Sequence, residues 1–164
     1  MKKFIKYSLF GIVYLVIIFG LAIMFIVTAK ADLTKPNDGI EPYQVVNIQL
    51  TGLKNNDIPN KNYGIEQTWK FAHPLNKKYT GPLPRFIKLL NSESYKMLLN
   101  HIENEIIEVF KSNSRYGFEV TILAKNKNYY KFQWVVEKYY KEGPLKDCWL
   151  TSSVSSPVSL GSSI

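Results

Sequence analysis

Cysteine is almost absent from this sequence: Cys148 is the only one in 164 residues. A single thiol excludes a disulfide within the chain and any zinc or iron–sulfur centre built from several cysteines. Glycine-rich phosphate-binding loops are also missing, as are the catalytic motifs Gly-x-Ser-x-Gly and His-Glu-x-x-His. No motif-defined class of enzyme is indicated, and we expect neither a metal nor a cofactor.

Charge is missing from a long stretch near the start of the chain. Residues 7–29 hold no Asp, Glu, Lys, Arg or His, and 14 of these 23 residues are Leu, Ile, Val or Phe. A helix of that length would extend about 34 Å, enough to span the hydrocarbon core of a bilayer at about 30 Å. Because Lys2, Lys3 and Lys6 precede it, the positive-inside rule predicts a single-pass anchor over residues 1–30, with the remainder on the periplasmic or extracellular side.

A cleaved secretory signal is the alternative for residues 1–30, because Ala29-Lys30-Ala31 imitates a cleavage site. The apolar region of a signal runs about 7 to 15 residues, which favours the uncleaved anchor. From Ala31 onward the chain carries 17 basic and 13 acidic residues, a net charge of only +4. Part of the overall charge of +8 therefore belongs to the anchor, and we expect no nucleic-acid partner.

The order of the hydrophobic patterns predicts an α+β fold. A polar tether at residues 31–39 precedes a domain at residues 40–155, and the serine-rich residues 156–164 are predicted to fray as a flexible tail. Helical spacing predicts helices over residues 41–54, from Asp57 to Ala72, over 83–90 and after Ser92, with a turn at 79–82. Alternating patterns predict strands at residues 105–111, 118–124, 132–136 and 148–154. Helices followed by hairpins favour helices packed on one face of an antiparallel sheet.

Several short motifs together suggest a family, namely Asn56-Asp57, Phe71-Ala72-His73-Pro74, Thr80-Gly81-Pro82-Leu83-Pro84-Arg85-Phe86, Tyr95 and Cys148-Trp149. The combination resembles the family catalogued as domain of unknown function 4864, a branch of the nuclear transport factor 2-like, or cystatin-like, superfold. The resemblance covers about residues 41–155 and departs from the family at His73 and Pro84. It implies a cone in which helices close the concave side of a curved antiparallel sheet. It implies no known reaction, so no catalytic residue transfers.

The candidate site is a pocket between the helices and the sheet. Large rings would meet there and seldom close a small cone without a gap, and polar groups would lie at the rim. The residues expected to line or edge this pocket are Trp69, His73, Arg85, Phe118, Phe132 and Trp134. A solid core filled by Phe71, Phe86 and Leu90 is the alternative.

Two functions from different classes remain open. The first is a binding or interaction module on the outer side of the membrane, holding a small apolar ligand or a partner. The second is an isomerase or dehydratase, which needs a carboxylate or histidine inside an apolar pocket. Asp57, His73 and Glu119 are the candidates for that role, and the shortage of such residues favours the module.

The sheet is apolar on both faces, which predicts a homodimer or an equivalent partner contact. The face away from the helices would expose Val109, Leu123, Val135 and Tyr139, a patch that monomers seldom tolerate. We interpret His101 beside two glutamates as an ordinary polar strand edge and not as a metal site. We interpret Cys148 as a small buried hydrophobic residue.

Overall fold

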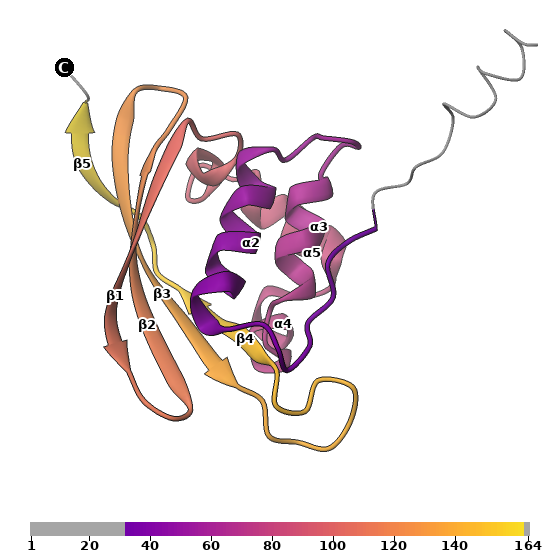
Figure 1. Ribbon diagram of the computed structural model, residues 1–164. Coiled ribbons are helices and arrows are strands. Elements are labelled where there is room, and N and C mark those ends of the chain that lie inside the picture. The colour runs from indigo at the N-terminus through magenta and orange to yellow at the C-terminus, as the bar shows by residue number, and fades with distance from the viewer. Residues whose placement is uncertain (1–31, 163–164) are drawn as a thin grey trace, which may run out of the picture. The chain divides into compact units, whose positions relative to one another are not determined.

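The computed structural model describes residues 32–162 of the chain (Figure 1). Within this range four α-helices and one short 3-10 helix come first, and five strands of one curved antiparallel sheet follow. The α+β arrangement predicted from the sequence is confirmed. The charge-free residues 7–29 lie outside the described range, and none of the helices inside it is long and apolar enough to cross a membrane.

Helix α2 (Pro42–Lys54) follows the apolar spacing that predicted it. Pro42 lies in the first turn, where a backbone N–H has no partner within the helix. The Gln44 side chain accepts a hydrogen bond from the backbone N–H of Glu41 at 2.9 Å and so fixes the start of the helix. The apolar side chains that α2 contributes to the core are Val45, Val46, Leu50 and Leu53.

Helix α3 (Tyr63–Lys70) is shorter than predicted, because Asp57 does not begin it. Asp57 instead accepts a hydrogen bond from the backbone N–H of Asn62 at 2.9 Å and closes the loop between α2 and α3. Gly64 lies where the two helices touch, since a Cβ there would be 2.0 Å from the carbonyl oxygen of Gly52. A residue of low helix propensity therefore allows the two backbones to pack closely.

Pro74 begins a helix, whereas the sequence predicted only that the preceding helix would end at Ala72. Helix α4 (Pro74–Thr80) starts at this proline because the first helical position needs no N–H donor. The Nδ1 atom of His73 accepts a hydrogen bond from the backbone N–H of Leu75 at 3.1 Å and caps the helix. Gly81 ends it with a φ of +84°, so the turn predicted at residues 79–82 is the C-terminal end of α4.

Helix α5 (Leu83–Leu90) confirms the third predicted helix. After it the sequence predicted a fourth helix, but the structure has only the 3-10 turn η1 (Lys96–Leu98). The hydroxyl of Ser92 donates a hydrogen bond back to the carbonyl oxygen of Leu89 at 2.7 Å. Serine that bonds to the preceding turn competes with helix formation, which explains why no longer helix starts there.

The four predicted strands are present, and a fifth follows them. The strands are β1 (Glu103–Lys111), β2 (Arg115–Leu123), β3 (Asn128–Lys138), β4 (Trp149–Val154) and β5 (Val158–Ser162). The first four lie in chain order, and β5 pairs with the other end of β3. The fraying predicted for residues 156–164 is therefore wrong for β5. Because β4 covers only the second half of β3, the first half is open for β5, with Asn128 opposite Ser162.

The core lies between the helices and one face of the sheet, which the helices cover (Figure 1). Alternate residues of β2 and β3 point to the helices and are fully buried. The register places Phe118 opposite Trp134 and Val120 opposite Phe132. Residues far apart in sequence thus form one continuous apolar surface beneath α2.

The opposite face of the sheet differs from the patch that the sequence predicted. Val109 is 55% exposed, but Leu123 is buried at 8%, and the ring of Tyr139 packs edge-on against His73 at 5.4 Å. Three exposed apolar side chains lie around the bulge in β1, where Ile107 and Phe110 flank Val109, and β5 carries two more, Val158 and Leu160.

Candidate functional site

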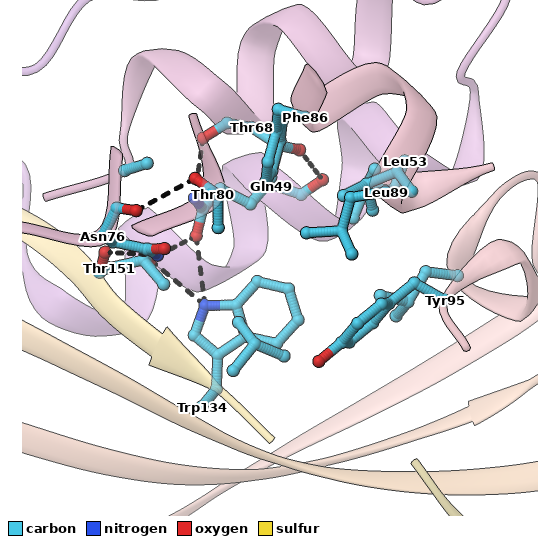
Figure 2. A pocket seen from close by; sticks show the side chains of 14 residues that line it. Gln49, Leu53, Thr68, Asn76, Thr80, Phe86, Leu89, Tyr95, Trp134 and Thr151 are labelled. Atoms are coloured by element: carbon cyan, nitrogen blue, oxygen red, sulfur yellow. Dashed lines mark hydrogen bonds between the residues drawn. The ribbon is translucent and has the colours of Figure 1, made fainter. Parts of the chain in front are cut away.

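A cavity of about 70 Å³ lies between the helical layer and strands β3 and β4. Figure 2 shows its lining from close by. None of the lining residues is Asp, Glu, Lys, Arg, His or Cys. They are Gln49, Leu53, Thr68, Ala72, Asn76, Thr80, Phe86, Leu89, Leu90, Tyr95, Leu98, Trp134, Thr151 and Val154.

One wall of the cavity is a hydrogen-bonded unit that we name the Gln49–Trp134–Thr151 cluster. The indole Nε1 of Trp134 donates to Gln49 Oε1 and to Thr151 Oγ1, each at 3.1 Å. The hydroxyl of Thr151 donates to the same Gln49 oxygen at 2.6 Å. All three residues are at most 2% exposed, so each donor is satisfied inside the protein.

The orientation of Gln49 is set by a fourth contact. Its Nε2 donates to the carbonyl oxygen of Thr68 at 3.0 Å, and the hydroxyl of Thr68 donates to the carbonyl oxygen of Gly64 at 2.8 Å. This assignment places the amide oxygen of Gln49 toward the cluster, where it accepts two hydrogen bonds. The cluster therefore ties α2, α3, β3 and β4 together at one point.

Two polar groups beside the cluster keep hydrogen-bonding capacity. Asn76 Nδ2 donates to the carbonyl oxygen of Thr151 at 3.2 Å, which leaves Asn76 Oδ1 without a partner among residues 32–162. The Tyr95 hydroxyl also makes no hydrogen bond within that range, and Figure 2 shows Tyr95 across the cavity from Asn76. A hydroxyl can donate and accept, so these two groups can orient a ligand.

Of the six residues predicted from the sequence, Trp134 lines this cavity. Phe118 and Phe132 are buried in the core on the same face of the sheet but do not reach the cavity. Arg85 is exposed on α5. Trp69 is partly buried, with the Nζ of Lys77 4.3 Å from its ring centre.

His73, the sixth, has a structural role at the edge of the helical layer. Its Nδ1 caps α4 and its backbone N–H donates to the carbonyl oxygen of Thr151 at 2.8 Å. Burial lowers the pKa of His73, and the nearby charge of Glu137 acts in the opposite direction. The ring is thus held neutral as a hydrogen-bond acceptor, because a protonated Nδ1 could not accept from Leu75.

The other titratable candidates also lie away from the cavity. The pKa of Asp57 is lowered, chiefly by the hydrogen bond from the backbone N–H of Asn62. Glu119 forms an ion pair with Lys131 at 2.9 Å. Cys148 is 2% exposed, as predicted for a buried hydrophobic residue, and burial raises the pKa of its thiol.

The polar lining of the cavity was not predicted from the sequence. One signal was present: Gln49 interrupts the apolar stripe of α2, four residues after Val45 and four before Leu53. A polar residue on a buried helix face needs a buried partner. Its partner Thr151 is 102 residues away in the chain, so helical spacing alone could not identify it.

No family model matches this chain, and the comparisons with curated proteins and with solved structures find no match either.

Proposed function

We propose that this chain is a membrane-anchored, outward-facing binding module that holds a small, uncharged, mainly apolar molecule in the cavity. The observation that carries the proposal is the lining, which is mostly hydrocarbon and has a saturated polar cluster on one wall. It also has two polar groups, Asn76 Oδ1 and the Tyr95 hydroxyl, that are unpaired within the described part of the chain. Pockets for small ligands combine apolar walls with a few polar groups in this way.

The size and polarity of the cavity limit the ligand. A volume of about 70 Å³ is several times the roughly 10–15 Å³ that one water molecule needs. The cavity has about half of the roughly 150 Å³ that holds a benzene ring, so it favours a molecule of only a few carbon atoms. A charged group would lose its hydration without an ionic partner in the lining. We therefore expect a neutral ligand with one hydroxyl or carbonyl group, held between Asn76 and Tyr95.

The alternative function is an isomerase or dehydratase that uses the same cavity. Such chemistry needs a general acid or base within hydrogen-bond reach of the bound molecule. Asp57, His73 and Glu119 each make structural contacts elsewhere, so the alternative has less support than the binding module.

We also propose a membrane anchor and a family for this chain. The charge-free residues 7–29 and the preceding lysines support a single-pass anchor in a lipid bilayer, with the domain on the periplasmic or extracellular side. Helices covering one face of a curved antiparallel sheet support the nuclear transport factor 2-like cone that the sequence resembles.

Thermal unfolding of the full chain in detergent tests the binding proposal. We expect acetone and 2-propanol, which are small enough for the cavity, to raise the melting temperature in a concentration-dependent way, because they would bind only the folded state. Acetate, which is of similar size but carries a charge, should not. Substituting Leu89→Phe at the cavity wall should abolish the shift. Equal shifts in wild type and variant, or no shift with either neutral compound, would contradict the proposal.

We also propose a homodimer, in which a second copy of the chain binds at the edge of the sheet. Among residues 32–162, strand β1 pairs only with β2, so no described strand occupies its other edge. Ile107 on this strand is 46% exposed. Antiparallel pairing of two β1 strands about Ile107 would place Glu103 of each copy opposite Lys111 of the other. Light scattering should therefore detect a dimer that Ile107→Lys disrupts and Gln133→Lys leaves intact. A wild-type monomer at high concentration would exclude it.

A further inference from the structure

The segment that leads into the domain is bound to the helical layer. The backbone N–H of Thr34 donates to Gln67 Oε1 at 2.8 Å, and Gln67 Nε2 donates to the carbonyl oxygen of Thr34 at 2.9 Å. Gln67 is on α3 and only 5% exposed. This pair of hydrogen bonds fixes the point at which the chain reaches the domain.

The bound segment shares a groove with the loop between α2 and α3. Thr34 and Ile58 both line this groove, whose volume is about 390 Å³. Ile58 is 68% exposed, and the exposed residues Lys54 and Lys61 flank it in sequence. The carboxylate of Asp57 is occupied by hydrogen bonds from Asn62 and Asn56, both at 2.9 Å. Lys54 precedes Asn55, which also lines the groove, and the charge of Lys61 acts on Asp57, next to Ile58. We name the four residues in or beside this groove, Thr34, Lys54, Ile58 and Lys61, the loop face.

The positive charge of the domain is concentrated in its helical part. Residues 32–100 carry nine basic and six acidic side chains, whereas residues 101–162 carry eight basic and seven acidic ones. The helical part with its leading segment therefore has a net charge of +3 and the sheet part of +1. Anionic lipid headgroups attract such lysines from within about a Debye length.

Chain length limits how far the loop face can lie from a membrane. Five Cα–Cα steps separate Ala29, the last residue of the charge-free stretch, from Thr34. Even fully extended, they reach at most about 18 Å. A chain anchored through residues 7–29 must therefore keep Thr34 close to the headgroups.

We propose that the loop face rests on anionic lipid headgroups, with Ile58 inserted among them and Lys54 and Lys61 against their phosphates. This inference depends on the proposed anchor. A hydrophobic side chain between lysines combines apolar insertion with electrostatic attraction, as peripheral membrane contacts do. The consequence is that the helical layer faces the bilayer and the edge of β1 is free to meet a second copy.

The test uses the full chain in nanodiscs containing nitroxide-labelled headgroups. A fluorophore is attached through Ile58→Cys or, as the matched control, through Val158→Cys on β5, where the native side chain is 58% exposed against 68% for Ile58. The native Cys148 is buried and does not compete for the label. In phosphatidylglycerol discs we expect quenching at position 58 several-fold greater than at position 158. Equal quenching at the two positions would overturn the proposal.

Charge variants test the role of the lysines. Adding Lys54→Glu and Lys61→Glu should reduce the quenching at position 58, since each lysine near an anionic surface contributes about fivefold to the local association. Adding Lys125→Glu and Lys141→Glu, the same change of charge at exposed positions in the loops that follow β2 and β3, should not. Quenching that is as strong in phosphatidylcholine discs, or indifferent to the loop lysines, would overturn the anionic docking.

Carbonate extraction separates this inference from the proposed anchor. A chain that alkaline carbonate releases from the membrane lacks the anchor, and both proposals then fail. A chain that is retained but shows no preferential quenching at position 58 keeps its anchor, and only the docking of the loop face is then wrong.

Discussion

The two faces of strand β3 show how differently this protein treats polar groups in contact with helices and in contact with water. On the face toward the helices, Trp134 is 1% exposed and its indole N–H is bonded to uncharged partners. On the other face, Lys131 forms an ion pair with Glu119 at 2.9 Å while both side chains keep about 30% of their exposure (33% and 27%). Burying a charge costs far more than burying a paired amide or hydroxyl, so charge stays on the outer face.

The largest loss of stability is expected from a substitution on the face of β3 that packs against the helices. Trp134→Ala should lower the free energy of unfolding by about 3–5 kcal/mol, because it enlarges the existing cavity and removes the indole N–H that donates to Gln49 and Thr151. Urea denaturation measures this loss. Gln133→Ala, at the neighbouring outer position, is the matched control and should cost little. A loss below about 1 kcal/mol for Trp134→Ala would show that the inner face does not depend on the ring.

Breaking the cluster without removing a ring should have a smaller effect. Gln49→Leu takes the acceptor away from Trp134 and Thr151 and should cost about 1–3 kcal/mol, the penalty of leaving buried donors with too few partners. A double-mutant cycle with Thr151→Val should give a coupling energy of about 0.5–3 kcal/mol. Additive losses in that cycle would mean that the two side chains do not act as one unit.

His73 is expected to make the stability of the helix-facing side depend on pH. Burial lowers its pKa in the folded state, so the unfolded chain binds the proton more readily. The stability due to neutral His73 is therefore complete above the unfolded pKa of about 6.5 and is lost as the pH falls from there to the lowered folded pKa. His73→Ala should cost about 1 kcal/mol at pH 8 through the lost cap. Denaturation between pH 5 and pH 8 should show a slope in wild type that this variant reduces, and identical slopes would contradict the assignment.

The smallest change in stability is expected from substitutions on the solvent-facing side of the sheet. Glu119→Gln and Lys131→Gln should each change the free energy of unfolding by only about 0.2–1 kcal/mol, because water screens a partly exposed ion pair. Raising the salt concentration to 1 M should reduce even that difference. If either variant cost as much as Gln49→Leu, the contrast between the two faces would not hold.

Several elements were predictable because their signals are local. The stripe of α2, the short apolar helix α5 and the alternation in β2 and β3 each lie within about a dozen neighbouring residues. Helix α4 was not predicted because it lacks such a local signal: none of its apolar side chains is buried, so no apolar stripe marks a helical face. In the candidate site, the large ring of Trp134 could be foreseen from its strand pattern, but its polar partners could not.

By itself, the sequence determined the α+β class, the order of helices and hairpins, and the side of the sheet that is buried. These features follow from hydrophobic periodicity, which can be recognised within a short stretch of neighbouring residues. Only the tertiary structure decided that β5 occupies the open half of β3, where its backbone groups find partners that composition does not reveal. It also decided that Gln49 meets Thr151 across 102 residues. Such contacts depend on how whole layers pack, since a buried hydrogen bond is satisfied by whichever group the fold brings within reach.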